Sequence, residues 1–197
     1  PEYDVADVLA KLHYAYEAIK TADPTAVIVS PPLLNFTFTC TGCASFNRGI
    51  DWAETFRLDY FTAHGEEPPV DIWAINAYPL DLNALPALDT GRVITQITGL
   101  REWLNARPAQ AGKPIWVTEF GVQWAYDQRD MTGGGCVPKP AGTYDTAGVQ
   151  GFLTTMYDWL DANADALNIE RWFQYVAYQD ITICNGDSYG GVILLDG

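Results

Sequence analysis

The apolar positions along the chain follow two spacings, and the two alternate through most of the sequence. Where apolar residues recur at steps of three and four, they mark one face of an amphipathic helix. This pattern predicts four helices: residues 4–22, residues 51–64, a third that begins after Thr90 and a fourth that begins near Thr146. Between them, short apolar runs predict four strands: residues 26–30, 70–76, 115–119 and 169–175.

This alternation of helix and strand is typical of a parallel sheet whose strands are joined by crossover helices. The first strand, residues 26–30, has no polar face, which suits a strand buried on both sides of such a sheet. No compositional break divides the chain, so we expect residues 1–197 to form a single α/β domain. Four strands fit half of a (β/α)8 barrel, which takes about 250 residues when complete, or an open doubly wound sheet.

The composition narrows the class of partner. Acidic residues outnumber basic residues 25 to 11, which gives a formal charge of −14 at pH 7. Such a surface repels phosphate backbones, so we expect no nucleic acid partner, and an uncharged substrate fits better than an anionic one. Because no apolar run reaches the roughly 18 residues of a membrane helix, we expect no membrane partner.

Four cysteines lie in segments that the pattern assigns to loops: Cys40, Cys43, Cys136 and Cys184. An even number of loop cysteines favours disulfides and an oxidising compartment, and of the three pairings we favour Cys40–Cys43 with Cys136–Cys184. The alternative is that Cys40 and Cys43 form a redox or metal half-site. A redox motif lies where a strand turns into a helix, and a zinc site needs further ligands at suitable spacing, so disulfides are the better interpretation.

The carboxyl ends of parallel strands meet at one edge of the sheet, where α/β proteins carry their functional residues. Here the strand ends bring one carboxylate, one amide and several tyrosines to that edge: Asn76 and Tyr78, then Glu119, then Tyr175 and Tyr178. The long segment after the third strand adds Trp124, whose ring suits either stacking on a sugar or packing of the loop against the sheet. The sequence therefore predicts one polar and aromatic site.

Glu119 is the most informative of these residues because it ends an apolar strand. Strict alternation along the strand places Ile115, Val117 and Glu119 on the same face. A carboxylate at such a place loses solvation unless it is paired or used in chemistry. It can serve as a nucleophile that attacks an anomeric carbon, or it can form a structural ion pair with a cation such as Arg171.

The segment KPIWVTEFG, residues 113–121, resembles the seventh strand of the clan A glycoside hydrolases, which are (β/α)8 barrels. In that family the glutamate of this strand is the nucleophile of a retaining mechanism, and Glu119 holds its position. The resemblance extends over nearly the whole chain and corresponds to strands five to eight. It implies that residues 1–197 are the second half of a TIM barrel, from the fourth helix through the eighth strand.

Two further segments extend the resemblance. Residues 70–79 are similar to the sixth strand of the family, in which a polar residue and a tyrosine point at the nucleophile; Asn76 and Tyr78 match that spacing. Residues 169–175 are similar to the eighth strand, which supplies an aromatic platform for sugar, and Tyr175 suits this role. The resemblance implies a retaining hydrolase of β-linked oligo- or polysaccharides that needs no metal or organic cofactor, and the cysteines favour a secreted or cell-surface location.

The clan A enzymes carry their acid/base in an Asn-Glu-Pro motif at the end of the fourth strand. This chain begins with Pro1 at about that place, so we expect the acid/base glutamate immediately upstream of Pro1, outside the sequence. Glu2 lies on the wrong side of the proline and is interpreted as an acidic residue near a helix N-terminus. Because retaining hydrolysis uses two carboxyl groups about 5 to 5.5 Å apart, we expect this fragment alone to be inactive or poorly active on natural glycans.

Two alternatives belong to other classes. A non-catalytic carbohydrate-binding protein would use the same barrel and aromatic rim, and its binding would survive Glu119→Gln. An unrelated doubly wound protein would need a ligand-binding fingerprint after a strand, and no glycine-rich phosphate loop follows Ser30, Tyr78 or Glu119.

Overall fold

The computed structural model describes residues 5–41, 48–81, 87–122, 128–129, 136–137 and 146–175. The helices along these residues are α1 (Val5–Ala22), α2 (Gly49–His64), α3 (Thr90–Asn105) and α4 (Thr146–Leu167). The strands are β1 (Leu33–Leu34), β2 (Trp73–Ala77), β3 (Ile115–Phe120), β4 (Gln128–Arg129), β5 (Cys136–Val137) and β6 (Ile169–Gln174). The alternation of helix and strand is confirmed, and β4 and β5 add a short antiparallel pair within a segment predicted to be a loop.

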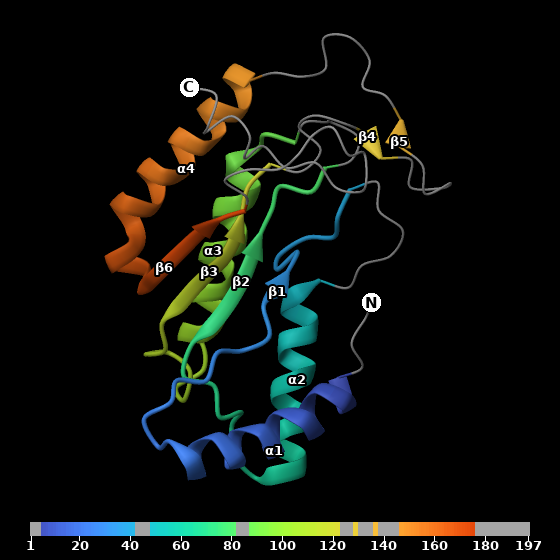
Figure 1. The fold of residues 1–197 in the computed structure, drawn as a ribbon, viewed down its shortest axis with the longest axis vertical. Helices are drawn as coiled ribbons and strands as arrows, with labels where there is room; N and C mark the ends of the chain where they lie inside the picture. The colour runs from blue at the N-terminus through green and yellow to red at the C-terminus, as the bar shows by residue number, and fades with distance from the viewer. Residues whose placement is uncertain are drawn as a thin grey trace.

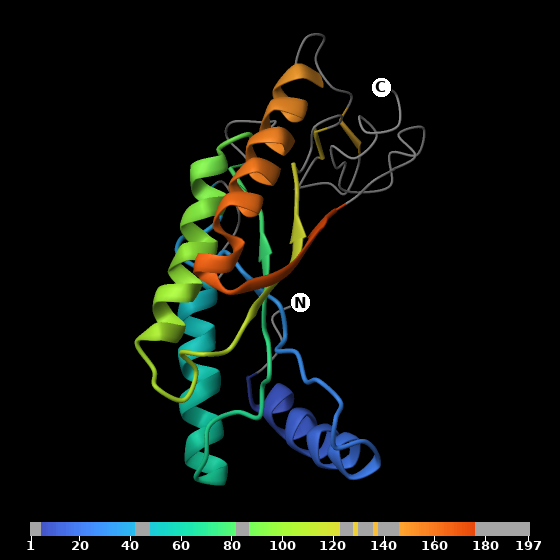
Figure 2. The same cartoon turned by 90° about the vertical axis from the view of Figure 1, so that its left-hand side faces the viewer.

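Four of the strands form one parallel sheet in the order β1-β2-β3-β6, so their order in space is their order in the chain. The helices α2, α3 and α4 connect them and lie on one face of the sheet (Figures 1 and 2). A doubly wound sheet reverses its strand order at one point and carries helices on both faces, so that alternative is wrong. Consecutive parallel strands with their helices on one face form part of a (β/α)8 barrel, as predicted.

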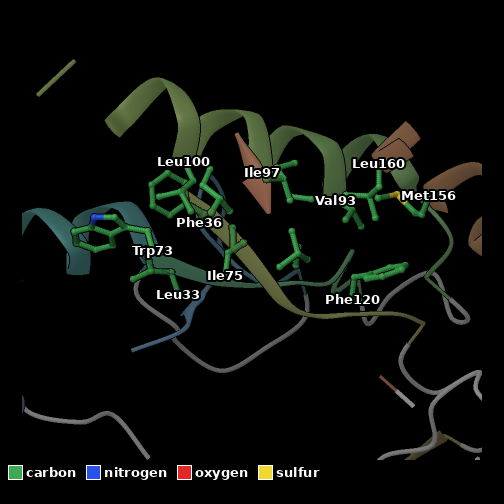
Figure 3. Packing of buried hydrophobic residues seen from close by; sticks show 14 of the residues in the cluster. Leu33, Phe36, Trp73, Ile75, Val93, Ile97, Leu100, Phe120, Met156 and Leu160 are labelled. Carbon is green, nitrogen blue, oxygen red and sulfur yellow. The ribbon is translucent and has the colours of Figure 1, made fainter. Parts of the chain in front are cut away.

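The main core lies between this sheet and the three helices. Figure 3 shows Val93, Ile97 and Leu100 of α3 above the sheet, with Met156 and Leu160 of α4 beside them. None of these five side chains is exposed to solvent, and burial of each stabilises the fold by about 1.5 to 3 kcal/mol. The apolar helix faces predicted from the sequence are therefore the faces that pack on the sheet.

The first strand lies later in the chain than predicted. Residues 26–30 lie beside the residues just before β2, where Val29 and Ile72 form only an isolated bridge, and regular pairing begins at β1. Pro31 and Pro32 separate the two pieces, because proline has no N–H to donate to a ladder. Ser30 fills part of the gap with its side chain, since its Oγ accepts a hydrogen bond from Ala74 N at 2.8 Å.

Two residues with positive φ end helices and turn the chain into the next element. Gly65 follows α2 with φ 73°, and its N–H donates to Phe61 O, so the helix ends where the predicted range 51–64 ends. Asn168, with φ 49°, is the single residue between α4 and β6. Asparagine tolerates this left-handed conformation better than most residues, so a one-residue connection can return the chain directly to the sheet.

The contact between α1 and α2 is built from rings. The Tyr60 hydroxyl and His13 Nδ1 hydrogen-bond at 2.9 Å, and the His13 ring stacks on His64 with centroids 3.9 Å apart. Burial, together with the nearby carboxylates of Glu66 and Glu17, raises the pKa of Tyr60 to about 12. The phenol therefore stays protonated at neutral pH and acts as a hydrogen-bonding group between the two helices.

Cys40 is the one cysteine whose side chain lies in the described part of the chain, and it is disulfide-bonded. The side chains of Cys43, Cys136 and Cys184 lie outside the described residues. The pairings Cys40–Cys43 and Cys136–Cys184 therefore stay predictions.

Candidate active site

The strands of the parallel sheet end at one edge (Figure 1), and the described candidate residues lie at or next to the ends of their strands. Tyr78 follows β2, Glu119 lies near the end of β3, and Tyr175 directly follows β6. The first strand contributes differently from the prediction. Because β1 ends at Leu34, the chain brings Asn35 to this edge in place of Ser30.

Glu119 is hydrogen-bonded to Tyr78, the tyrosine that the sequence predicts to point at it. The Tyr78 hydroxyl donates to Glu119 Oε2 at 2.7 Å. Tyr78 is 5% exposed and packs with Cys40, Leu80 and Leu34, so its ring is held in one direction. A buried tyrosine keeps its hydroxyl bonded to a partner, and here the partner is the carboxylate on the neighbouring strand.

The face that Glu119 occupies differs from the one that strict alternation predicts. Val117 and Phe120 are buried in the main core, whereas Thr118 and Glu119 between them are only partly buried. The register between β2 and β3 shifts here, because Val117 opposes Ile75 whereas Glu119 opposes the very next residue of β2. β3 thus contains one extra residue, Thr118, and a bulge of this kind re-aims the side chains that follow it. The predicted common face of Val117 and Glu119 is therefore wrong, and the bulge turns Glu119 toward Tyr78.

Asn76 forms a second polar pair between the same two strands. Thr118 Oγ1 donates to Asn76 Oδ1 at 2.7 Å and lies 3.3 Å from Ile75 O. Asn76 and Glu119 are register partners across the bulge. Asn76 thus lies beside Glu119 in the sheet with its amide oriented by Thr118, and its role at the nucleophile stays a prediction.

Gly121, which follows β3, allows the strand ends to approach closely. A Cβ atom at this position would lie 2.4 Å from the Tyr175 carbonyl oxygen and 3.8 Å from the Tyr78 ring. The Tyr175 N–H also donates to Phe120 O at 2.9 Å, which continues the pairing of β3 with β6. The sequence prediction did not single out Gly121; a glycine directly after a strand end is the signal for a close backbone approach.

The aromatic residues predicted to bind sugar fall into two groups. Tyr175 is 42% exposed, so part of it faces solvent at this edge. Trp124 and Tyr178 lie outside the described residues, and their roles stay predictions.

The alternative role of Glu119, an ion pair with Arg171, has no support in the described contacts. The Arg171 guanidinium lies over the Trp116 ring, 5.3 Å from its centroid, and Trp116 Nε1 donates to Glu170 Oε2 at 3.1 Å. The ion pairs found between described side chains do not include Glu119. The carboxylate is held by a neutral hydroxyl donor instead.

Two polar residues of α3 contact this edge and were missed by the sequence prediction. Gln96 Nε2 donates to Tyr78 O at 2.8 Å, and Gln96 Oε1 accepts from Phe36 N at 3.3 Å. Arg92 Nη1 donates to Pro79 O at 3.0 Å. A glutamine within the apolar stripe of a predicted helix was the available signal, because a buried amide needs partners.

Within the described ranges, no group of three or more His, Cys, Asp or Glu side chains is placed to hold a metal ion. None of the helices that the structure describes has the length and apolar character needed to cross a bilayer. The expected independence from metal and organic cofactors stays a prediction. What the edge offers is a carboxylate, a hydroxyl donor and an amide, which suit nucleophilic and acid–base chemistry.

The fold and the site together define a class of protein. Consecutive parallel strands with polar side chains gathered at their carboxyl edge are typical of (β/α)8 barrels, which carry their functional residues at that face. The chain belongs to the family described as glycosyl hydrolase catalytic core, whose model matches residues 6–190. This match confirms the predicted resemblance to the glycoside hydrolases at the level of the family.

A search among curated proteins finds no match. Among solved structures, the chain is similar to a mutant of a GH128 (subgroup I) endo-beta-1,3-glucanase from Amycolatopsis mediterranei, crystallised in complex with laminarihexaose. The identity is 18% and the TM-score is 0.36, and the match covers 73% of this chain and 50% of that chain. The chain thus spans about half the length of that solved structure.

Proposed function

We propose that the protein is a retaining glycoside hydrolase that cleaves β-linked oligo- or polysaccharides, with Glu119 as its nucleophile. The observation that carries the proposal is the 2.7 Å hydrogen bond from the Tyr78 hydroxyl to Glu119 Oε2. It lies at the carboxyl edge of a sheet that belongs to a glycosyl hydrolase catalytic core. A strand-end carboxylate whose direction is fixed suits a mechanism with a covalent glycosyl-enzyme intermediate.

In the first step, Glu119 Oε1 attacks the anomeric carbon while the glycosidic C–O bond breaks and its electron pair leaves with the departing oxygen. A general acid protonates that oxygen. In the second step, water attacks the anomeric carbon, its proton passes to the same acid/base group, and Glu119 is released as a carboxylate. Tyr78 donates to Oε2 in both steps and holds the plane of the carboxylate. We assign the acid/base to a second carboxyl about 5 to 5.5 Å from Glu119.

Asn76 and Tyr175 are the proposed sugar contacts among the described residues. The Thr118 hydroxyl already donates a hydrogen bond to Asn76 Oδ1. We therefore assign the other end of the amide, Asn76 Nδ2, as a donor to a sugar hydroxyl near the reacting carbon. Tyr175 offers a partly exposed ring on which a sugar face can stack. Trp124 and Tyr178 are assigned similar aromatic contacts from the sequence alone.

The nature of the substrate and the location of the protein are further parts of the proposal. A formal charge of −14 supports a neutral glycan in preference to an anionic polymer. A location outside the cell rests on the even number of cysteines, of which Cys40 is disulfide-bonded.

The test compares Glu119→Gln with the unsubstituted chain on aryl β-glycosides that carry good leaving groups. Such substrates need little help from a general acid, so the assay reports on the nucleophile. We expect Glu119→Gln to lower kcat about a thousandfold or more. Glu170→Gln is the matched control, because Glu170 is also a strand glutamate but lies at the start of β6 and bonds to Trp116; its kcat should not change.

Two further measurements distinguish the mechanism from its alternatives. A 2-deoxy-2-fluoro glycoside should label Glu119, as located by peptide mapping, and proton NMR should show products with retained anomeric configuration. Inverted products, or a label on another residue, would overturn the assignment. If every substrate binds without turnover and Glu119→Gln binds equally well, the protein is a non-catalytic carbohydrate-binding protein instead.

A further inference from the structure

A glutamine lies on the face of α3 where the pattern calls for apolar side chains. Gln96 has no exposed surface, and its neighbours on this face, Val93, Ile97 and Leu100, all belong to the main core. An amide buried in such surroundings costs free energy unless its polar atoms are hydrogen-bonded. The partners of Gln96 therefore indicate what the residue does.

The amide of Gln96 joins two strand ends to one helix. Its Nε2 donates to Tyr78 O at 2.8 Å and to Arg92 O at 3.2 Å. Its Oε1 accepts from Phe36 N at 3.3 Å, in the segment that follows β1. Both ends of the amide are used, and both of its contacts outside α3 lie at the carboxyl edge of the sheet.

Tyr78 is the partner that links this amide to the chemistry. β2 ends at Ala77, so Tyr78 is the first residue after the strand, and its carbonyl is held from the helix side by Gln96. The same residue carries the hydroxyl that donates to Glu119 Oε2. Since the ring is attached to this stretch of backbone, a displacement of the Tyr78 carbonyl moves the hydroxyl relative to Glu119.

A second residue of α3, one turn earlier, holds the next part of the same segment. Arg92 Nη1 donates to Pro79 O at 3.0 Å, and its Nη2 donates to Thr41 Oγ1 at 2.8 Å. The Thr41 N–H in turn donates to Leu80 O at 3.2 Å. The first turns of α3 thus hold the segments that follow β1 and β2 together. Gln96 is the residue of α3 that bonds to Tyr78 itself.

We propose that Gln96 is a positioning residue for the nucleophile: it fixes Tyr78, and Tyr78 fixes Glu119. The proposal rests on the function proposed above only for the catalytic role of Glu119; the positioning itself is a property of the fold. Without the amide, the Tyr78 segment relaxes away from α3 and its bond to the carboxylate lengthens. Misplacement of a catalytic group by about 1 Å can cost about a hundredfold in rate.

The chain offers a matched control in Gln110. This glutamine also has no exposed surface and also bridges two groups with its amide. Its Oε1 accepts from Trp73 Nε1 at 3.1 Å, and its Nε2 donates to Glu67 Oε2 at 3.0 Å. These partners lie at and before the start of β2, at the opposite edge of the sheet. Gln110→Met should therefore lower stability as Gln96→Met does, without a path to Tyr78.

The experiment places Gln96→Met and Gln110→Met in the whole chain, labelled with tyrosine carrying carbon-13 at Cζ. The Cζ shift reports the hydrogen bonding of each phenol; Tyr78→Phe assigns the Tyr78 resonance, and Glu119→Gln shows how far it moves when the bond to the carboxylate changes. We expect Gln96→Met to move this resonance in the direction seen with Glu119→Gln. On aryl β-glycosides, we expect kcat to fall about ten- to a hundredfold with little change in KM. Gln110→Met should leave the Tyr78 resonance and kcat unchanged.

The NMR measurement decides the proposal whether or not the protein turns over a glycoside. A Tyr78 resonance that stays at its original position in folded Gln96→Met overturns the proposal, as does an equal displacement in Gln110→Met. If Gln96→Met does not fold, Gln96→Asn keeps an amide that is too short to reach both partners, and the same comparison applies. Failure of the proposed function appears separately, as unchanged turnover in Glu119→Gln.

Discussion

The close approach of β3 and β6 predicts that Gly121→Ala is costly for both stability and activity. The added Cβ would lie 2.4 Å from the Tyr175 carbonyl oxygen. A carbon–oxygen contact is normally about 3.3 Å or longer, so the two segments must separate by roughly 0.9 Å. The atom that must move is backbone, which cannot rotate out of the way as the end of a side chain can. Overpacking of this kind costs about 1 to 3 kcal/mol.

The same displacement reaches the site. Tyr175 follows β6, and the added methyl also meets the Tyr78 ring at 3.8 Å. We therefore expect Gly121→Ala to lower the free energy of unfolding in urea by about 1 to 3 kcal/mol. We also expect it to lower kcat on aryl β-glycosides by about a hundredfold, because Gly121 lies two residues after Glu119 and the separation of β3 from β6 displaces the nucleophile.

Gly151→Ala, on the exposed side of α4, is the matched control. A Cβ there meets nothing within 4 Å, and alanine is favoured over glycine inside a helix by about 0.5 to 1 kcal/mol. This variant should be more stable than the parent chain and equally active. If Gly121→Ala matched the parent in both unfolding and kcat, the strand ends would not be in contact at Gly121, and the reasoning would fail.

Two further predictions concern the parts of the fold away from the site. Arg101→Met should lower the free energy of unfolding by about 3 kcal/mol or more, because the buried guanidinium donates to backbone carbonyls before β3 and β6 that would lose their donors; urea unfolding equal to that of the parent would contradict this. Burial alone would raise the pKa of Glu54, but hydrogen bonds from Arg57 and Arg107 have a larger combined effect. The pKa of Glu54 in the folded state therefore lies below its ordinary value of 4.5. The charge of Glu54 therefore contributes stability above pH 4.5 that is lost as the pH falls through the folded-state pKa. Urea unfolding from pH 7 to about pH 3 should show a smaller loss for Glu54→Gln than for the parent, and parallel profiles would refute the assignment.

The sequence predicts the elements whose structure depends on local pattern. The strands around Ile115 and Ile169 and the four helices are found where apolar spacing places them, because each buries a continuous run or stripe of side chains. The pairing of Tyr78 with Glu119 is also predicted, since parallel strands must bring their carboxyl ends to one edge.

The features that the sequence does not predict depend on partners distant in the chain. Pro31 shifts the first strand because ladder hydrogen bonding, and not apolar character, decides where pairing begins. The bulge at Thr118 arises from the match between β3 and β2, so alternation within β3 alone puts Glu119 on the wrong face. The roles of Gly121 and Gln96 depend on which backbone segment lies opposite them, and that is known only once the sheet is assembled.

α3 divides its contacts between the two edges of the sheet. A crossover helix runs antiparallel to the strands that it connects, so its first turns lie near their carboxyl ends and its last turns near their starts. Arg92 and Gln96 accordingly bond to the segments after β1 and β2, whereas Arg101, in the last turns, bonds to the carbonyls before β3 and β6. Changes in the first turns should therefore affect stability and kcat together, and changes in the last turns should affect stability alone. Because a general loosening of the helix would lower kcat from either end, this difference between the two ends is what separates positioning from mere stabilisation.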